Sequence, residues 1–475
     1  MISRRSTFKA AAGIAATASF GVAQNAHAAD TVIKIGMSMS FTGADAESAM
    51  RVSNGGIFAF EEANAAKTVK GVTFEIVKLD DATATAGQYD PAQAATNARK
   101  MVSDKAVVAA LGPQMSGAGK AMAPILSAGN LATITPSSTN PDITDPKFAA
   151  QYRPAGKAIY FRTVATDAFQ GPNMANYMID TLKIKSVYIL DDSGAYGVGL
   201  ADAFQSQAEK KGIKVLGRDR LDPKAADYAT ILTKIKAANP DALYYGGVGQ
   251  AGVKLAKQAY EIVPKMIKAG GDGMQSADLL KGAGFPAVEG WYATVAAPHV
   301  TDDPKSAAFS DKYFKRFNIR PDDYTITCYV GAQVIIEAVK KVAATGKPVT
   351  RDAVRDAIEG VKLPGSLLGS IEFDANGDLK NKIISVFQIK KDEKADLGDP
   401  DKQYKYVGVA PMASRQEVCS PGCSSLPSLR GALATKQPRG CNAHRRTPGL
   451  PRFARNDAVP STTMCHKGSF ADDVW

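Results

Sequence analysis

Histidine and cysteine are scarce in this sequence. The chain of 475 residues contains 4 histidines and 5 cysteines, and between residues 30 and 413 each type occurs once, as His299 and Cys328. A single thiol cannot form a disulfide within that part of the chain, and acid–base catalysis lacks the residue that most often performs it. The Gly-x-x-x-x-Gly-Lys-Ser/Thr phosphate loop and the His-Glu-x-x-His zinc motif are also missing. We therefore expect a protein that is not an enzyme and uses no cofactor or metal.

Long apolar runs and basic clusters are missing as well. After the N-terminal segment no stretch approaches 18 uninterrupted apolar residues, which excludes a membrane-spanning helix there. The net charge of +11 is concentrated at the two ends of the chain, which leaves only +3 on residues 30–413. Without a clustered Lys/Arg run, this part offers no surface for a phosphate backbone, and we expect no nucleic-acid partner.

The N-terminus has the pattern of a secretory signal peptide. Residues 3–9 are basic, residues 10–23 form a small apolar run, and Ala26-His27-Ala28 provides small residues for cleavage. Arg4-Arg5 followed by Phe8 and Lys9 also resembles a twin-arginine signal, so either export route fits. We predict that residues 1–29 are removed and that the mature protein is soluble in the periplasm.

The last 62 residues differ from everything before them. Residues 414–475 are rich in Pro, Ser, Arg and Cys and have no periodic apolar pattern. The spacing of Cys419, Cys423, His444 and Cys465 is too irregular to predict a zinc site. A membrane tether or a partner-binding arm would need denser basic residues than Arg445-Arg446. We predict a disordered appendage.

Between these ends, strand and helix patterns alternate in two series, which is typical of parallel α/β folds with two lobes. The first series has strands at 32–39, 72–79, 106–111 and 132–135 and helices at 56–66, 91–102 and 116–128. The second has helices at 171–182, 197–211 and 228–238 and strands at 186–190, 214–216 and 242–245. Residues 141–160, rich in Pro, Gly and charge, are predicted to form a loop at the lobe boundary.

Two acidic pairs and His299 are the remaining candidates for catalytic groups. Asp80-Asp81 and Asp191-Asp192 lie at strand ends, where adjacent side chains point to opposite faces and cannot converge on one atom. Capping of backbone groups is the predicted role for both pairs. His299, in a loop, is expected to be a solvated residue rather than a ligand or base.

Hydroxyl groups follow two of the predicted strands. Residues 112–117 come after the strand at 106–111, and Ser137-Ser138-Thr139 come after the strand at 132–135. Ligands of parallel sheets bind at the carboxyl edge, where helix N-termini and hydroxyls such as that of Ser116 favour a carboxylate. An equally good interpretation is that these residues are N-caps and turn residues.

Several short segments, taken in order and spacing, resemble the branched-chain amino-acid (leucine/isoleucine/valine) binding proteins of bacterial ABC importers from about residue 33 to about residue 390. The segments are Val77-Lys78-Leu79-Asp80-Asp81, residues 134–139, Phe161-Arg162-Thr163, Gln170-Gly171-Pro172, residues 196–200 and residues 243–247. The resemblance implies the type I periplasmic binding protein fold, in which two Rossmann-like lobes are joined by three crossovers, here near Thr166, Val295 and Ile384. It also implies lobes of residues 30–166 with 296–384, and 167–295 with 385–413.

The resemblance implies a set of ligand-binding residues. Ser116 matches the serine that binds the ligand carboxylate, Thr139 the threonine that contacts both ends, and Asp272 a position where the family carries a Glu for the ammonium. The other implied contacts are Ser137, Ser138, Tyr196, and Tyr244 or Tyr245. Hydroxyls and N–H dipoles for a carboxylate, with a carboxylate for an ammonium, suit a zwitterion.

Departures from the family pattern affect the shape of the pocket. Ser48 stands where an aromatic lid is frequent, and Tyr324 stands where an apolar side chain would line the pocket. Met115 and residues 81–86 lack the family's disulfide.

The resemblance implies a periplasmic solute-binding protein that closes by a hinge on a branched-chain or similar small aliphatic amino acid. Its partners would be an inner-membrane ABC permease and its ATPase, and it would act as a monomer. A sensor domain, or a binder of an amide or an aromatic acid, is the alternative.

Overall fold

The computed structural model describes residues 30–413, and within them no helix is long and apolar enough to cross a membrane. The predictions made for residues 1–29 and 414–475 lie outside this range.

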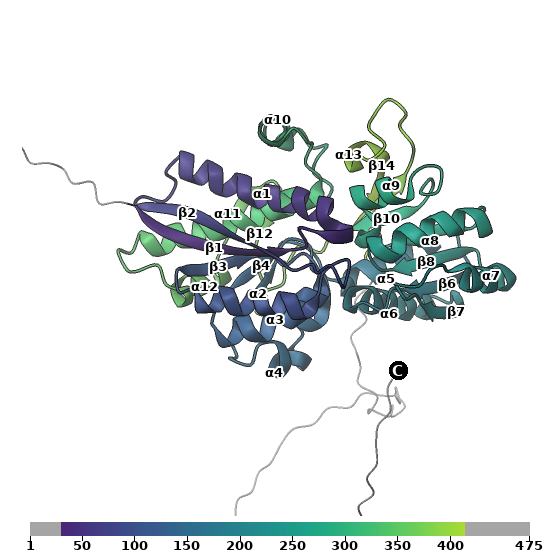
Figure 1. Cartoon of the computed structure of the whole chain (residues 1–475), viewed down its shortest axis with the longest axis horizontal. Helices are drawn as coiled ribbons and strands as arrows, with labels where there is room; N and C mark the ends of the chain where they lie inside the picture. Colours follow the sequence, from purple (N-terminus) through teal and green to yellow (C-terminus); the bar gives the residue numbers. More distant parts are fainter. Residues whose placement is uncertain (1–29, 414–475) are drawn as a thin grey trace, which may run out of the picture. The chain divides into compact units, whose positions relative to one another are not determined.

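The first sheet has five parallel strands in the order β2-β1-β3-β4-β5. They are β1 (Thr31–Met39), β2 (Val72–Asp80), β3 (Val107–Leu111), β4 (Thr133–Thr135) and β5 (Tyr160–Arg162). The helices of this lobe are α1 (Ala46–Ala65), α2 (Pro91–Ser103), α3 (Ser116–Ala128), α4 (Ala149–Tyr152), α10 (Pro304–Phe317), α11 (Asp323–Ala343) and α12 (Arg351–Glu359). In Figure 1, α1 and α11 lie together on one face of the sheet, and α2 and α3 lie on the other.

The local sequence explains these elements. Along β1, Ile33, Ile35, Met37 and Met39 on one face are at most 4% exposed and Ser38 on the other face is 1% exposed, as expected for a strand with both faces covered. Helix α2 begins with Pro91, whose missing N–H is not needed there, and the Asp90 side chain accepts a hydrogen bond from the N–H of Ala92 at 2.8 Å.

The second sheet has seven strands in the order β14-β13-β10-β9-β8-β6-β7. They are β6 (Ser186–Asp191), β7 (Lys214–Arg220), β8 (Ala242–Gly246), β9 (Ile267–Gly270), β10 (Tyr292–Val295), β13 (Ser385–Ile389) and β14 (Tyr404–Val409). Strands β13 and β14 pair antiparallel, whereas β6 to β10 are parallel. The associated helices are α5 (Asp167–Asp180), α6 (Ala195–Lys210), α7 (Ala229–Ala238), α8 (Gly249–Ile262), α9 (Ala277–Ala283) and α13 (Pro400–Gln403). A small hairpin, β11 (Leu363–Ser366) and β12 (Gly369–Ile371), follows α12.

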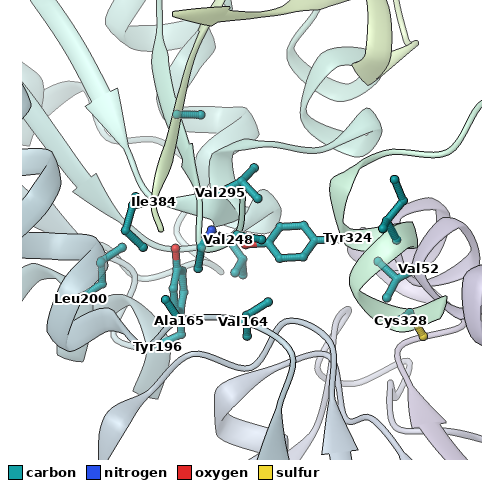
Figure 2. Packing of buried hydrophobic residues seen from close by; sticks show 14 of the residues in the cluster. Val52, Val164, Ala165, Tyr196, Leu200, Val248, Val295, Tyr324, Cys328 and Ile384 are labelled. Carbon is teal, nitrogen blue, oxygen red and sulfur yellow. Dashed lines mark hydrogen bonds between the residues drawn. The ribbon is translucent and has the colours of Figure 1, made fainter. Parts of the chain in front are cut away.

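The chain passes between the lobes three times, as the α/β fold with three crossovers predicted: it enters the second sheet after β5, returns to the first lobe as α10 to α12 after β10, and re-enters the second sheet at β13. The crossovers lie against one another. The N–H of Ala165 donates to the carbonyl of Ala296 at 2.7 Å, and the hydroxyl of Ser385 donates to the carbonyl of Ala297 at 2.7 Å. Figure 2 shows Val164, Ala165, Val295 and Ile384 gathered beside Tyr196 and Tyr324. The connections are therefore packed into the apolar core close to the carboxyl ends of the strands.

Two predictions about elements were wrong. Residues 141–160 are not the lobe boundary, because they connect β4 to β5 within the first sheet and contain α4 and two 3₁₀ turns. Helix α1 begins at Ala46 rather than near residue 56, because polar residues such as Arg51 are buried in its first turns and hide the apolar period.

Candidate functional site

A pocket of about 520 Å³, counted with space open to solvent, lies between the two lobes. The cavity volume proper is only about 60 Å³, below the roughly 300–1,000 Å³ of small-molecule sites, so the two lobes lie close together around the pocket. The first lobe contributes Asp45, Ser48, Val52, Gln114, Met115, Ser116, Ser137 and Tyr324, and the second contributes Tyr196, Val248, Asp272, Gly273, Gln275 and Ser276. Most of these residues follow the carboxyl ends of parallel strands, which is where such folds bind ligands.

Asp272 is the centre of the second-lobe side of the pocket. Asp272 is 9% exposed, and its two carboxyl oxygens accept hydrogen bonds from the hydroxyls of Tyr196 and Tyr324. Its backbone N–H donates to the side-chain oxygen of Gln170 at 3.1 Å. Burial raises the pKa of Asp272, and the two tyrosine hydrogen bonds oppose that rise only in part. A carboxyl group held in this way gains from a cation that enters the pocket.

Ser116 occupies the opposite, first-lobe side at the first residue of α3. Its hydroxyl oxygen accepts the N–H groups of Thr139 at 3.2 Å and Asn140 at 3.1 Å, which leaves its own hydrogen free to donate. The first N–H groups of a helix have no partner within the helix and carry a partial positive charge. Ser137 lies beside them and donates to the carbonyl of Gln114 at 3.1 Å. This side of the pocket suits a carboxylate.

The structure thus brings six of the predicted residues to one pocket. These are Ser48, Ser116, Ser137, Tyr196, Asp272 and Tyr324. Ser138 and Thr139 lie just behind the lining: the hydroxyl of Ser138 accepts that of Tyr160 at 2.9 Å, and Thr139 is fully buried. Contacts of these residues with a ligand stay predictions.

Tyr244 and Tyr245 do not line the pocket. Both are fully buried in β8, whose faces are covered by helices. The ring of Tyr244 stacks on Phe204 at 3.6 Å between centroids, and the hydroxyl of Tyr245 donates to the carbonyl of Val248 at 3.0 Å. Their position inside the sheet makes them core residues of the second lobe, and it is Val248, beyond the end of β8, that reaches the pocket.

Asp45 and Gln114 line the pocket, and sequence analysis did not identify either. Asp45 lies in the 3₁₀ turn Gly43–Asp45 before α1, and Gln114 lies in the loop that leads to Ser116. Burial, together with the charges of Asp278, Asp192 and Asp81, raises the pKa of Asp45 to about 7. The only available signal was their place after strand ends, which many turn residues share. None of the lining residues within 30–413 is Lys, Arg or His.

Contacts join the two lobes at the rim of the pocket. The N–H of Ser48 donates to the Asp278 carboxylate at 2.9 Å, and Lys281 pairs with Glu47 at 2.6 Å. On the other side, the Asn140 side chain donates to the carbonyl of Ala195 at 2.8 Å.

The acidic pairs act as predicted only in part: Asp80, Asp191 and Asp192 accept backbone N–H groups, whereas Asp81 accepts the hydroxyls of Ser38 and Ser40, and Asp191 also pairs with Arg218 at 2.9 Å. Asp80 accepts the N–H groups of Phe41 at 2.9 Å and Ala82 at 3.0 Å, and Asp192 accepts those of Gly194 at 2.9 Å and Val248 at 3.0 Å.

The prediction for His299 was wrong. Its side chain is 11% exposed, with ring nitrogens 2.9 Å from Asp323 and 3.1 Å from Asp302, and it stacks on Tyr406. Burial alone would lower the pKa of His299, but the two carboxylates, Asp323 foremost, raise it to about 9. The charged imidazole of His299 is held in the crossover after β10 by its pairing with Asp323 and Asp302.

Comparisons with known proteins agree with this architecture. Residues 32–394 match the family model described as periplasmic binding protein. The Leu/Ile/Val-binding protein BraC3 of Rhizobium johnstonii is 29% identical over 78% of this chain and 94% of its own length. The leucine-, isoleucine-, valine-, threonine-, and alanine-binding protein of Pseudomonas aeruginosa is 30% identical over 80% of this chain and 95% of its own.

Solved structures share the fold. A leucine-binding protein from Thermotoga maritima superposes with a TM-score of 0.68, at 24% identity over 80% of this chain and 98% of that one. A solute-binding protein of an ABC transporter from R. palustris, in complex with benzoate, gives 0.65 at 18% identity over 81% of this chain and 98% of that one. The family consists of binding proteins and not enzymes, which confirms that expectation. The chain belongs to the branched-chain amino-acid binding protein family of periplasmic binding proteins.

Proposed function

We propose that this protein is the periplasmic solute-binding component of an ABC importer and that it captures an amino acid between its two lobes. Family membership supports the binding role. One observation carries the ligand class: the pocket joins a buried carboxyl group, Asp272, to the N-terminal turn of α3 with Ser116. A zwitterion presents an ammonium to the first and a carboxylate to the second, and both pairings are charge-assisted hydrogen bonds.

The two lobes close around this ligand by a hinge at the three crossovers, with lobe boundaries near residues 166, 295 and 384. Each lobe supplies one half of the zwitterion site, so the ligand is bound fully only when the lobes meet. The closed monomer then delivers the amino acid to an inner-membrane permease driven by its ATPase. Export through the signal in residues 1–29 brings the protein to the periplasm.

Isothermal titration calorimetry on the full-length protein tests the proposal. The ligands are leucine, isoleucine, valine and alanine, with leucinamide, 4-methylpentanoate and benzoate as compounds that lack one charge. We expect the amino acids to bind, and each compound that lacks the ammonium or the carboxylate to lose about 2 kcal/mol or more.

Variants locate the effect. Asp272→Asn is expected to weaken amino acids at least about thirtyfold and to leave benzoate unaffected or improved, because the buried carboxylate no longer opposes an anion. The control, Asp202→Asn, removes an exposed carboxylate of the same lobe outside the pocket and should leave both affinities unchanged. Benzoate that binds more tightly than every amino acid would refute the amino-acid assignment and favour an aromatic acid.

A further inference from the structure

Asp45 is a buried carboxyl group in the pocket for which one oxygen has no partner. The residue is 5% exposed, and its Oδ2 makes no hydrogen bond within the described chain. Although Asp45 precedes α1, its side chain does not cap that helix. An unpaired carboxyl oxygen that has been removed from water destabilises the protein, because it has lost its hydrogen bonds to water without replacing them. Because this oxygen lies at the pocket wall, a hydrogen-bond donor on a bound ligand can pair with it.

Gln114 presents a second unpaired acceptor on the same side of the pocket. The residue is 7% exposed, and its Oε1 has no hydrogen-bond partner among the described residues. Its Nε2 donates to the Ser48 hydroxyl oxygen at 3.0 Å, which orients the amide with the oxygen free. The first lobe therefore offers two buried acceptors, both lining the pocket and both without a donor.

The surroundings of Asp45 are acidic. The negative charges of Asp81, Asp192 and Asp278 disfavour ionisation of Asp45. The charges of Asp192, Asp45 and Asp81 likewise add to the effect of burial in raising the pKa of Tyr89. No basic side chain lines the pocket within residues 30–413, and the neighbouring Lys281 is paired with Glu47. A positive charge brought by a ligand would therefore meet a matched site, whereas an aliphatic group would leave Asp45 unpaired.

We infer that Asp45 and Gln114 form a second subsite, which accepts a cationic group at the end of the ligand's side chain. The inference rests on the proposed function, because Asp272 and Ser116 hold the α-ammonium and α-carboxylate. It extends the ligand range from small aliphatic amino acids to basic amino acids with an unbranched side chain. Among side chains of equal length, the one that ends in an ammonium binds more tightly.

Calorimetry on the full-length protein tests this with matched ligands. Lysine differs from norleucine, and ornithine from norvaline, only by a terminal ammonium in place of a hydrogen. We expect the basic member of at least one pair to bind at least about tenfold more tightly. In Asp45→Asn this preference should fall by about tenfold while the affinity for norleucine and norvaline changes less than about threefold.

The control variant is Glu47→Gln, which removes a carboxylate two residues along the chain that does not line the pocket. It should leave the ratio of lysine to norleucine affinity unchanged, because a subsite depends on direct contact and not on the general field. A similar loss in both variants would contradict the inference. So would equal weakening of lysine and norleucine in Asp45→Asn, which would mean that Asp45 acts on closure against the nearby start of α8 at Gly249.

Proton release gives a second measurement that needs no variant. A cation next to Asp45 favours its ionised form, so lysine should release more protons at pH 7 than norleucine does, as seen by titration in buffers of different ionisation enthalpy. Equal proton release for lysine and norleucine refutes the subsite.

The affinities separate failure of the subsite from failure of the proposed function. Tight binding of norleucine with weaker binding of lysine refutes the subsite but leaves the proposed function intact, whereas failure of every amino acid to bind overturns both. If glutamine bound as tightly as lysine, the subsite would accept a neutral amide and would not require a cation, which would contradict the inference.

Discussion

The hydroxyl of Tyr324 on α11 donates a hydrogen bond to the carboxyl group of Asp272 in the opposite lobe. Tyr196 from the second lobe donates to the other oxygen of the same carboxyl group. One acidic group is thus shared by a phenol from each lobe, and the Tyr324 hydroxyl also accepts the N–H of Ala296 in a crossover at 3.2 Å. The ligand site and the hinge are therefore connected through a single side chain.

Tyr324→Phe should weaken amino-acid binding by about tenfold, because it removes one donor to Asp272 and leaves the N–H of Ala296 unpaired. The matched control is Tyr244→Phe. The Tyr244 hydroxyl is buried without a hydrogen-bond partner in residues 30–413, and it lies outside the pocket. Its removal should leave affinity unchanged in calorimetry. A loss of binding in Tyr244→Phe would restore the pocket role that sequence analysis predicted for it.

The stability of the ligand-free protein should fall between pH 5 and pH 8. Burial raises the pKa of Asp45 to about 7 and of Asp81 and Asp192 to about 6, and it raises the pKa of Asp167 as well. In the unfolded chain these groups titrate near about 3.9, so at pH 5 the folded state binds more protons and is favoured. The advantage is lost as the pH rises through the folded values.

Chemical denaturation at pH 5, 6, 7 and 8 measures this effect, and we expect the free energy of unfolding to fall by at least about 1 kcal/mol. Asp45→Asn should reduce the slope, since it removes one of the titrating groups. Stability that rises over this range would mean that these carboxyl groups are solvated in the ligand-free protein.

His299 should stabilise the protein below about pH 9. Its folded pKa of about 9 exceeds the ordinary value of about 6.5, so its contribution is complete below 6.5 and disappears as the pH rises through 9. His299→Gln should cost up to about 3 kcal/mol at pH 6 and much less at pH 10. Asp302→Asn, which changes the partner that is 80% exposed, should have a small effect by comparison. Equal losses for His299→Gln at both pH values would point to packing against Tyr406 alone.

The sequence predicted the elements whose signals are local. The apolar run of β1 and the Asp90-Pro91 start of α2 are physical signals contained within a few residues, and both elements are where they were expected. The carboxyl edge that carries Ser116 and Ser137 followed from the order of strands and helices.

The misses concern positions whose surroundings come from distant parts of the chain. Asp45 is an ordinary turn residue until the second lobe covers it, and its burial cannot be read from the spacing of its neighbours. Tyr244 and Tyr245 follow one another in a strand covered on both faces, so their sequence cannot distinguish a core position from a pocket position. His299 becomes buried because Asp323, 24 residues later, and the rings of Phe387 and Tyr406 pack against it.

We expect closure of the lobes to depend on the hydrogen bond from the N–H of Ser48 to Asp278 more than on the ion pair between Glu47 and Lys281. Both contacts cross the rim of the pocket, but the lysine side chain is 50% exposed and such pairs contribute about 0–1 kcal/mol, whereas Ser48 also lines the pocket. Asp278→Ala is therefore expected to weaken an amino-acid ligand by about tenfold, mainly through faster dissociation. Lys281→Ala should change the affinity by less than about threefold.

Stopped-flow dissociation gives the rates, and small-angle scattering shows whether the lobes move. The radius of gyration of wild-type protein should decrease when the ligand saturates it, because both lobes contribute to one site, and the decrease should be smaller in Asp278→Ala at equal ligand concentration. The same profile with and without saturating ligand would mean that the lobes are already closed. In that case, the loss in Asp278→Ala would have to come from the position of Ser48 in the pocket wall and not from the hinge.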